Sequence, residues 1–410
     1  MVADVFFANA KNVGFRNSLV DKVDKLWKKA GLEKWICKGD RVLLKTHFGH
    51  LGATQYLRPV YLWKLVQLIK QARGIPVVGE TCGLGLSRRQ PYSGTTLPGY
   101  IKVAAQNGHS LSSLGAPIVM IDGYWGTETI AVKVNRKHLE FVNVAMGLSD
   151  FDKVIIAARF KGHDGFGFGG ALKQLGVGCV GKQGKGLVHY GAGNLYVKSP
   201  ENCDACERCI QVCPTRCITL VDGKPVIDEE KCIICLHCIG VCNEGKEREQ
   251  RVFSVRKYLR ADEQVLRMTE NALGVVKMVG KENIFYVNFA LDIGPQCDCA
   301  PFSSLSIVPD QGVLASKDPV AVDQACVDLV TKAKGIPGSP LEVGVKEEFA
   351  EAEIKGSMEY LASGFQKLGL LSTFVPEELR SKIAGLQLAE AEKLGLGTRK
   401  YRLISVEEDD

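Results

Sequence analysis

Short apolar runs alternate along the chain with longer stretches in which apolar residues recur every three or four positions. The short runs predict buried strands at 41–47, 75–81, 117–122, 151–160 and 283–292. The longer stretches predict helices at 58–74, 97–107 and 262–279, the first with Pro59 near its start and Gly74 at its end. This alternation predicts an α/β fold, in which helices flank both faces of a mostly parallel sheet.

A cysteine-rich segment interrupts this alternation, because nine of the 15 cysteines fall between residues 203 and 242. One pattern of spacing occurs twice there, first in Cys203, Cys206, Cys209 and Cys213 and then in Cys232, Cys235, Cys238 and Cys242. Between the two repeats, ITLVDGKPVID predicts a β-hairpin that turns at Asp222-Gly223. We therefore predict a small α+β module at 199–245, inserted into an α/β body formed by 1–198 and 246–410.

The repeated spacing resembles that of the bacterial two-cluster ferredoxins, in which four-iron clusters are bound by cysteine thiolates. The resemblance implies two 4Fe-4S clusters, one on Cys203, Cys206, Cys209 and Cys242 and the other on Cys213, Cys232, Cys235 and Cys238. Structural zinc is the alternative, although zinc sites usually show two CxxC pairs rather than this repeated run. The ninth cysteine, Cys217, is expected to pack in the core of the module.

The charge balance changes the picture little. The 410-residue chain carries 52 Lys and Arg against 46 Asp and Glu, and two bound clusters would offset most of the excess. We find no dense basic run and no apolar run of membrane length, so we expect neither a nucleic-acid partner nor a membrane span. The start, MVADVFFANAKNVGF, lacks the features of a secretory signal, so the many cysteines predict a cytoplasmic protein with a metal role.

Polar residues follow several predicted strands at their carboxyl ends, where open α/β sheets bind ligands. His47 follows the first predicted strand and Glu80 ends the second. Lys161 and His163 follow the fourth, and this pair can hold an anionic substrate and supply a proton. We therefore take Lys161, His163 and His47 as candidate catalytic residues; the alternative is an ordinary turn and a hydrogen-bonded structural histidine.

The next segment, GFGFGGALKQLGVGCVGKQGKGLVHYGAG, is rich in glycine and permits close approach of the backbone to a ligand. Lys173, Lys185 and His189 lie in it and, with Glu80, are candidates for an anion or substrate pocket. The alternative is a solvated connecting loop. No flavin fingerprint is present, so flavin binding stays open.

Two further cysteines form a CxC pair at Cys297 and Cys299. Such a pair can chelate a metal, or place one thiolate near another cofactor, so we predict a third metal site there. The isolated cysteines Cys37, Cys82 and Cys179 are expected to be small buried hydrophobic residues, as is Cys326.

Blocks across nearly the whole chain resemble the domain of unknown function 362 family. The resemblance rests on THFG at 46–49, PVVGET at 76–81, KGH with GFGGALKQLG at 161–176, CDC at 297–299 and PDQGVLASKDPVAVDQA at 309–325. It implies the α/β fold and, because members often carry an inserted two-cluster module and are widespread in anaerobes, the clusters as well. The stretch 335–375 fits the pattern least well and is expected to be a helical insertion.

These observations predict an iron–sulfur oxidoreductase that passes electrons from two clusters to a small anionic substrate in the body. A body far larger than a carrier needs favours this function. One alternative is an electron relay for another oxidoreductase, and another is a metal-handling or cluster-handling protein with an extra site at Cys299 and a histidine. In either redox case we expect a redox partner protein, such as a ferredoxin or an oxidoreductase.

Overall fold

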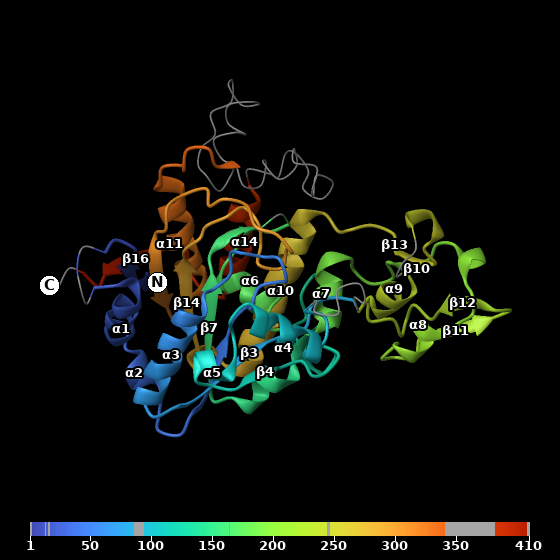
Figure 1. Ribbon diagram of the computed structural model, residues 1–410, viewed down its shortest axis with the longest axis horizontal. Coiled ribbons are helices and arrows are strands. Elements are labelled where there is room, and N and C mark those ends of the chain that lie inside the picture. The colour runs from blue at the N-terminus through green and yellow to red at the C-terminus, as the bar shows by residue number, and fades with distance from the viewer. Residues whose placement is uncertain are drawn as a thin grey trace.

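A computed structural model describes residues 2–12, 14, 17–85, 94–163, 165–243, 247–340 and 382–407 (Figure 1). Its centre is an eight-stranded sheet. In spatial order the strands are β16 (Tyr401–Ser405), β1 (Ala3–Asn9), β15 (Gly312–Ser316), β14 (Ile284–Ala290), β7 (Lys153–Arg159), β2 (Arg41–Lys45), β3 (Ile75–Glu80) and β4 (Ile118–Met120). Only β15 runs against the others, so the sheet is mostly parallel.

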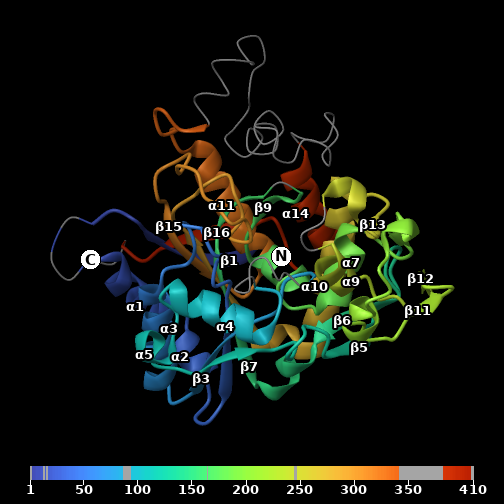
Figure 2. The same cartoon turned by 45° about the vertical axis from the view of Figure 1, so that its right-hand side comes forward.

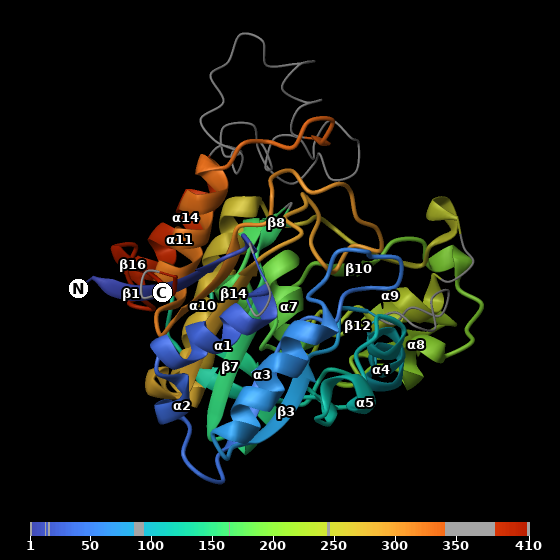
Figure 3. The same cartoon turned by 60° about the vertical axis from the view of Figure 1, so that its left-hand side comes forward.

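Helices cover both faces of this sheet because side chains alternate along each strand. In β7, Val154 and Ile156 face one hydrophobic core, while Ile155 and Ala157 face the other. The second core is covered by α1 (Leu19–Lys29), α2 (Leu32–Trp35), α3 (Pro59–Gln71), α4 (Leu97–Gln106) and α5 (Leu111–Leu114). The first is covered by α6 (Ala171–Gly176), α10 (Ala261–Val279), α11 (Pro319–Lys332) and α14 (Ile383–Lys393). Figure 3 shows α1 and α3 in front of β7 and β3. The α/β fold is therefore confirmed.

Shorter elements connect these layers. They are the hairpins β5 (Thr129–Lys133) with β6 (Phe141–Ala145) and β8 (Lys161–His163) with β9 (Gly167–Gly169), the helix α7 (Lys182–His189), and 3-10 turns at Met146–Asp150, Pro200–Asn202, Arg248–Gln250 and Lys281–Asn283. Among the described helices, none combines the length and the apolar character that a membrane crossing requires.

The cysteine-rich segment folds as a lobe at one end of the body (Figures 1 and 2). It contains α8 (Arg208–Gln211), α9 (His237–Cys242) and the hairpin of β11 (Ile218–Val221) with β12 (Lys224–Ile227). The turn of the hairpin lies where the sequence predicts it, with positive φ at both Asp222 (49°) and Gly223 (73°). At the base of the lobe, β10 (Leu195–Val197) pairs with β13 (Phe253–Val255), so the chain leaves and rejoins the body at one place.

The helices and strands predicted from the apolar pattern of the sequence are present in the structure. The five predicted strands correspond to β2, β3, β4, β7 and β14, and the three predicted helices to α3, α4 and α10. The prediction for Cys37 is wrong, because this cysteine is exposed, whereas Cys82, Cys179 and Cys326 are buried as expected. Cys37 lies just before β2, at a turn where its backbone N–H binds Asp40. Most of the predicted helical insertion, 341–375, lies outside the described residues, as does the predicted module boundary at 245.

Candidate functional site

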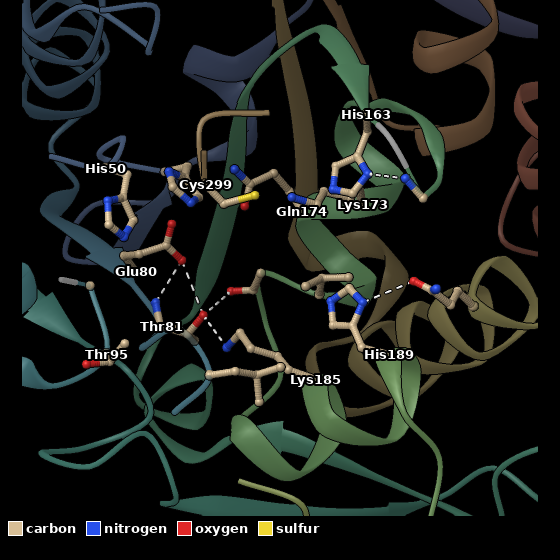
Figure 4. A pocket seen from close by; sticks show the side chains of 18 of the residues that line it. His50, Glu80, Thr81, Thr95, His163, Lys173, Gln174, Lys185, His189 and Cys299 are labelled. Atoms are coloured by element: carbon tan, nitrogen blue, oxygen red, sulfur yellow. Dashed lines mark hydrogen bonds between the residues drawn. The ribbon is translucent and has the colours of Figure 1, made fainter. Parts of the chain in front are cut away.

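A cavity of about 480 Å³ lies beyond the carboxyl ends of β2 and β3 (Figure 4). It brings together candidates that the sequence analysis singles out in distant parts of the chain, namely His47, Glu80, His163, Lys173, Lys185, His189 and Cys299. Further lining residues that the sequence did not single out include Tyr100, Gln174, Tyr190, Tyr258 and Gln264. The predicted candidates therefore share one cavity, with the exception of Lys161 and Cys297.

Glu80 forms a buried ion pair at the cavity wall. Its Oε1 accepts hydrogen bonds from Lys45 Nζ at 2.5 Å and from the Thr81 backbone N–H at 2.7 Å. Lys45 Nζ also donates to Gln174 Oε1 at 3.0 Å. The second oxygen, Oε2, is buried, and no donor reaches it within the described part of the chain. A buried carboxylate oxygen without a donor costs free energy, so this atom is a natural place for a ligand N–H or O–H group.

Lys185 supplies a positive charge to the same part of the cavity wall. Its Nζ donates to Thr81 Oγ1 at 2.9 Å and to the Val180 carbonyl at 2.6 Å. Asp122 Oδ2 lies 3.8 Å from the same nitrogen. Burial lowers the pKa of Lys185 and raises the pKa of Asp122 to about 6. The positive charge that a bound anion meets here therefore depends on the protonation state of both groups.

Binding of an anion in the cavity is expected to strengthen as the pH falls through about 6, where Asp122 takes up a proton. Protonation removes the negative charge beside Lys185, and low pH also keeps the lysine charged. Calorimetric titration with sulfate at about pH 5 and about pH 8 measures this change. Histidines in the cavity titrate in the same direction, so Asp122→Asn serves as the reference. Equal pH dependence in the two proteins would contradict the role given to Asp122.

His47 is half-buried at the cavity, and desolvation lowers its pKa to about 4. Its Nδ1 accepts from the Gly49 backbone N–H at 3.0 Å, and Tyr100 Oη lies 3.3 Å from both ring nitrogens. Because His47 is neutral at pH 7, it is better placed to orient a ligand than to act as an acid there. Burial keeps the pKa of Tyr100 well above its usual range, so its hydroxyl remains a donor. Tyr100 lies on α4, where helical spacing gives no sign of a site.

Lys161 lies behind the cavity wall. Its Nζ is 3.2 Å from Asp298 Oδ2 and donates to the Arg159 carbonyl at 3.1 Å. Arg159 Nε donates to the other carboxylate oxygen of Asp298 at 2.7 Å. Two cations therefore fix the buried Asp298, and with it the loop that carries Cys297 and Cys299. The structure thus places Lys161 as a support for this loop, since the strand end directs its side chain to Asp298.

The CxC pair lies beside His163 and Lys173. One ligand atom from each of His163, Cys297 and Cys299 lies within 4.8 Å of the others. Lys173 Nζ is 3.1 Å from Cys297 Sγ. A hydrogen bond from Cys299 and the nearby positive charges lower the pKa of Cys297 in spite of its burial. Burial alone would lower the pKa of Lys173, but the nearby negative charge on Cys297 raises it.

The ferredoxin resemblance divides eight of the nine cysteines of the lobe into two groups. Cys213, Cys232, Cys235 and Cys238 of one group line one small void together with Cys217. Burial raises the pKa of Cys209 to about 11. Negative charge on Cys242, Cys203 and Cys206 raises the pKa of Cys209 as well. Each group offers four thiols of the kind that hold a four-iron cluster, so the residues fit that cofactor.

Backbone strain supports this fit. Ala205, Glu207, Ile234 and Leu236 have φ between 52° and 61°, a region that residues other than glycine rarely adopt. They occupy equivalent positions in the two repeats, directly before the second cysteine and directly after it. For the β-branched Ile234 this conformation is costly, and such strain persists only where the surroundings demand it. Both cysteine loops therefore adopt the same backbone conformation around their thiols, although their non-glycine residues disfavour positive φ.

The second cysteine group adjoins the cavity through two segments of the body. Gly83 and Leu84 line the cavity, Leu84 packs on the core of the lobe, and the Gly85 N–H donates to the Cys235 carbonyl at 2.9 Å. On α7, Lys185 faces the cavity, while a Cβ added to the neighbouring Gly186 would collide with the Ile234 carbonyl. The same two segments therefore form part of the cavity wall and also the surface against which the second cysteine loop packs.

Lys182 links the lobe to the body at this place. Its buried Nζ contacts the carbonyl oxygens of Gly85 at 2.9 Å and Thr95 at 2.6 Å, and His237 Nε2 at 2.8 Å. His237 lies between Cys235 and Cys238, and its Nδ1 is 3.1 Å from the Val212 carbonyl. Burial lowers the pKa of Lys182 to about 8. An ammonium group is therefore held beside the second cysteine loop.

Comparison with known proteins identifies a family. A search of curated proteins returns no match. Among solved structures, the lactate racemase apoprotein from Thermoanaerobacterium thermosaccharolyticum is 12% identical, with a TM-score of 0.36 over 98% of this chain and 82% of that chain. The model of the family described as Domain of unknown function (DUF362) matches residues 42–328, which include the cavity and the lobe. The chain therefore belongs to the DUF362 family.

Proposed function

We propose that the protein is an iron–sulfur oxidoreductase, in which electrons pass from two clusters in the lobe to a small anionic substrate in the cavity. The observation that carries the proposal is the shared wall described above. Gly83 and Leu84 line the cavity, and the adjacent Gly85 donates a hydrogen bond to the second cysteine loop. An electron carrier has no need of an enclosed cavity lined by lysine, histidine and carboxylate side chains, and this favours an enzyme over a relay.

The two cysteine groups differ in exposure, and the difference gives the electrons a direction. Cys206 is exposed and Cys203 is half-buried, whereas Cys235 and Cys238 are buried. A donor protein can therefore approach the first group from solvent, while the second group faces the body. We propose that a redox partner docks over Cys206 and that electrons leave through the second group.

The side chains of the cavity have separate roles in this proposal. When bound, the clusters would supply single electrons at low potential. Lys173 and Lys185 hold the anionic part of the substrate, and Glu80 Oε2 accepts a hydrogen bond from it. His163, which lines the same cavity, donates a hydrogen bond or a proton to the group that is reduced. Leu84 and Tyr190 restrict the access of water.

Anaerobic reoxidation tests the proposal. The protein is reduced with dithionite, freed of excess reductant and mixed with tetrathionate, sulfite or crotonate, while the visible absorption of the clusters is followed. We expect at least one of these anions to restore the oxidised spectrum, at a rate about tenfold or more lower in Lys185→Met because one charged contact is lost. Lys38→Met, at an exposed position distant from the cavity, is the control. Equal rates in all three proteins would refute an enzymatic role for the cavity.

A further inference from the structure

The CxC pair lies in a β-turn that the body holds firmly. The Ala300 N–H donates to the Cys297 carbonyl at 2.9 Å, which closes a turn with Asp298 and Cys299 at its centre. Asp298 is buried and fixed by Arg159 and Lys161. The turn brings the two sulfur atoms within 4.8 Å of each other, so rotation of the side chains can bring them to bonding distance.

The two thiols have different surroundings. Cys297 is 6% exposed and pairs with Lys173 Nζ at 3.1 Å, which favours its thiolate. Cys299 is exposed and lines the cavity, where a bound substrate would meet it. A hydrogen bond joins Cys299 to Cys297. The sulfur of Cys299 therefore faces the cavity, and the Cys297 thiolate lies next to it, away from the cavity.

His163 is arranged for hydrogen bonding rather than for metal ligation. The Gly165 N–H donates to His163 Nδ1 at 3.1 Å, so in the neutral ring the proton lies on Nε2. A histidine that binds a metal through Nε2 instead carries its proton on Nδ1 and donates it to an acceptor. In this tautomer the ring presents an N–H group, which can stabilise a thiolate.

We propose that Cys297 and Cys299 form a redox-active dithiol that reduces a small, negatively charged molecule containing a sulfur–sulfur bond. The proposal names the substrate class of the cavity and relies on the proposed function only for the source of electrons. Lys185 and Lys173 recognise the anionic groups, and Cys299 reaches the sulfur–sulfur bond.

The reaction is balanced in two steps. Cys299 attacks one sulfur of the substrate and its proton passes to the leaving sulfur, which forms a mixed disulfide, releases one thiol and leaves Cys297 as the thiolate. The Cys297 thiolate then attacks Cys299 Sγ, which forms the Cys297–Cys299 disulfide and releases the second substrate sulfur as thiolate. Two electrons, which clusters bound in the lobe would supply, and one proton from solvent would then restore one thiolate and one thiol.

Differential alkylation tests this chemistry without interference from the lobe. Trypsin releases residues 282–317 as one peptide, and Cys297 and Cys299 are its only cysteines. The full-length protein is treated anaerobically with tetrathionate and alkylated; it is then reduced with a phosphine and alkylated with an isotopically heavy reagent. We expect two heavy labels on this peptide from the wild type and from the control Cys37→Ser, and loss of the paired labels in Cys299→Ser. Two light labels in the wild type would overturn the proposal.

Two further measurements separate this proposal from competing outcomes. A metal that binds one per chain, protects both cysteines from alkylation and is lost in His163→Gln would overturn the dithiol in favour of a metal site. If the disulfide forms but dithionite reduces it to the dithiol equally fast in the wild type and in Cys235→Ala, the proposal of a redox-active dithiol stands. The proposal that electrons pass through the clusters is then refuted. A much slower return in Cys235→Ala supports both proposals.

Discussion

Replacing Cys235 by alanine is expected to lower the iron content of anaerobically purified protein from about eight to about four atoms per chain. Cys235 lines the void that it shares with three other cysteines of its group. A cubane needs four ligands, so loss of one thiolate from this enclosed site should abolish the second cluster and spare the first. Electron delivery to the cavity should stop as well, because the lost cluster is the one that adjoins the cavity wall.

The matched control is Cys217→Ser. Cys217 is buried in the same lobe, and its Sγ lies 3.4 Å from Cys213 Sγ, yet the ferredoxin resemblance assigns it no cluster. We expect this variant to keep about eight iron atoms and a normal spectrum. Iron and acid-labile sulfide analyses measure both variants. Unchanged iron in Cys235→Ala, or loss of iron in Cys217→Ser, would show that the ligand sets are assigned incorrectly.

Replacing Lys182 by methionine is expected to lower the reduction potential of the second cluster by on the order of 50–100 mV. Lys182 is buried, and no carboxylate forms an ion pair with it among the described residues. Its Nζ reaches His237, which separates two cysteines of that group. A buried ammonium next to a cluster stabilises the extra electron of the reduced state, and methionine keeps a similar volume without the charge.

Lys231→Met provides the comparison for Lys182→Met. Lys231 directly precedes Cys232 in the sequence, but its side chain is 66% exposed and pairs with Asp228. Solvent and salt screen an exposed charge, so we expect a shift of only about 10–20 mV. Redox titration followed by electron paramagnetic resonance resolves the two clusters. Equal shifts in both variants would mean that Lys182 does not act on the second cluster through its buried charge.

The sequence predicts much of the cavity because parallel strands end at one edge of the sheet. His47, Glu80 and His163 follow or end different strands, and that rule alone places them together. It does not give the direction of a side chain after the strand ends, which is why Lys161 lies behind the wall at Asp298. The rule also does not identify Tyr100, because this residue lies on helix α4, where its spacing indicates only a buried position.

The same limit applies to the fold. Strands such as β7 and β14 are long buried runs, and their apolar residues identify them. By contrast, β1 and β16 pair across 398 positions of the sequence, and Arg402 of β16 binds Asp4 of β1. β1 has only a short apolar run, Val5 to Ala8, and β16 has no such run, so their membership in the sheet depends on partners distant in the chain.

Anomalous scattering at the iron edge, from a crystal of anaerobically purified protein, tests the central claim most directly. We predict two compact four-iron peaks in the lobe, with the one bound by Cys213, Cys232, Cys235 and Cys238 closer to the cavity wall at 83–85. A single zinc ion at each group of cysteines, or an iron cluster of the lobe that lies away from this wall, would contradict the account.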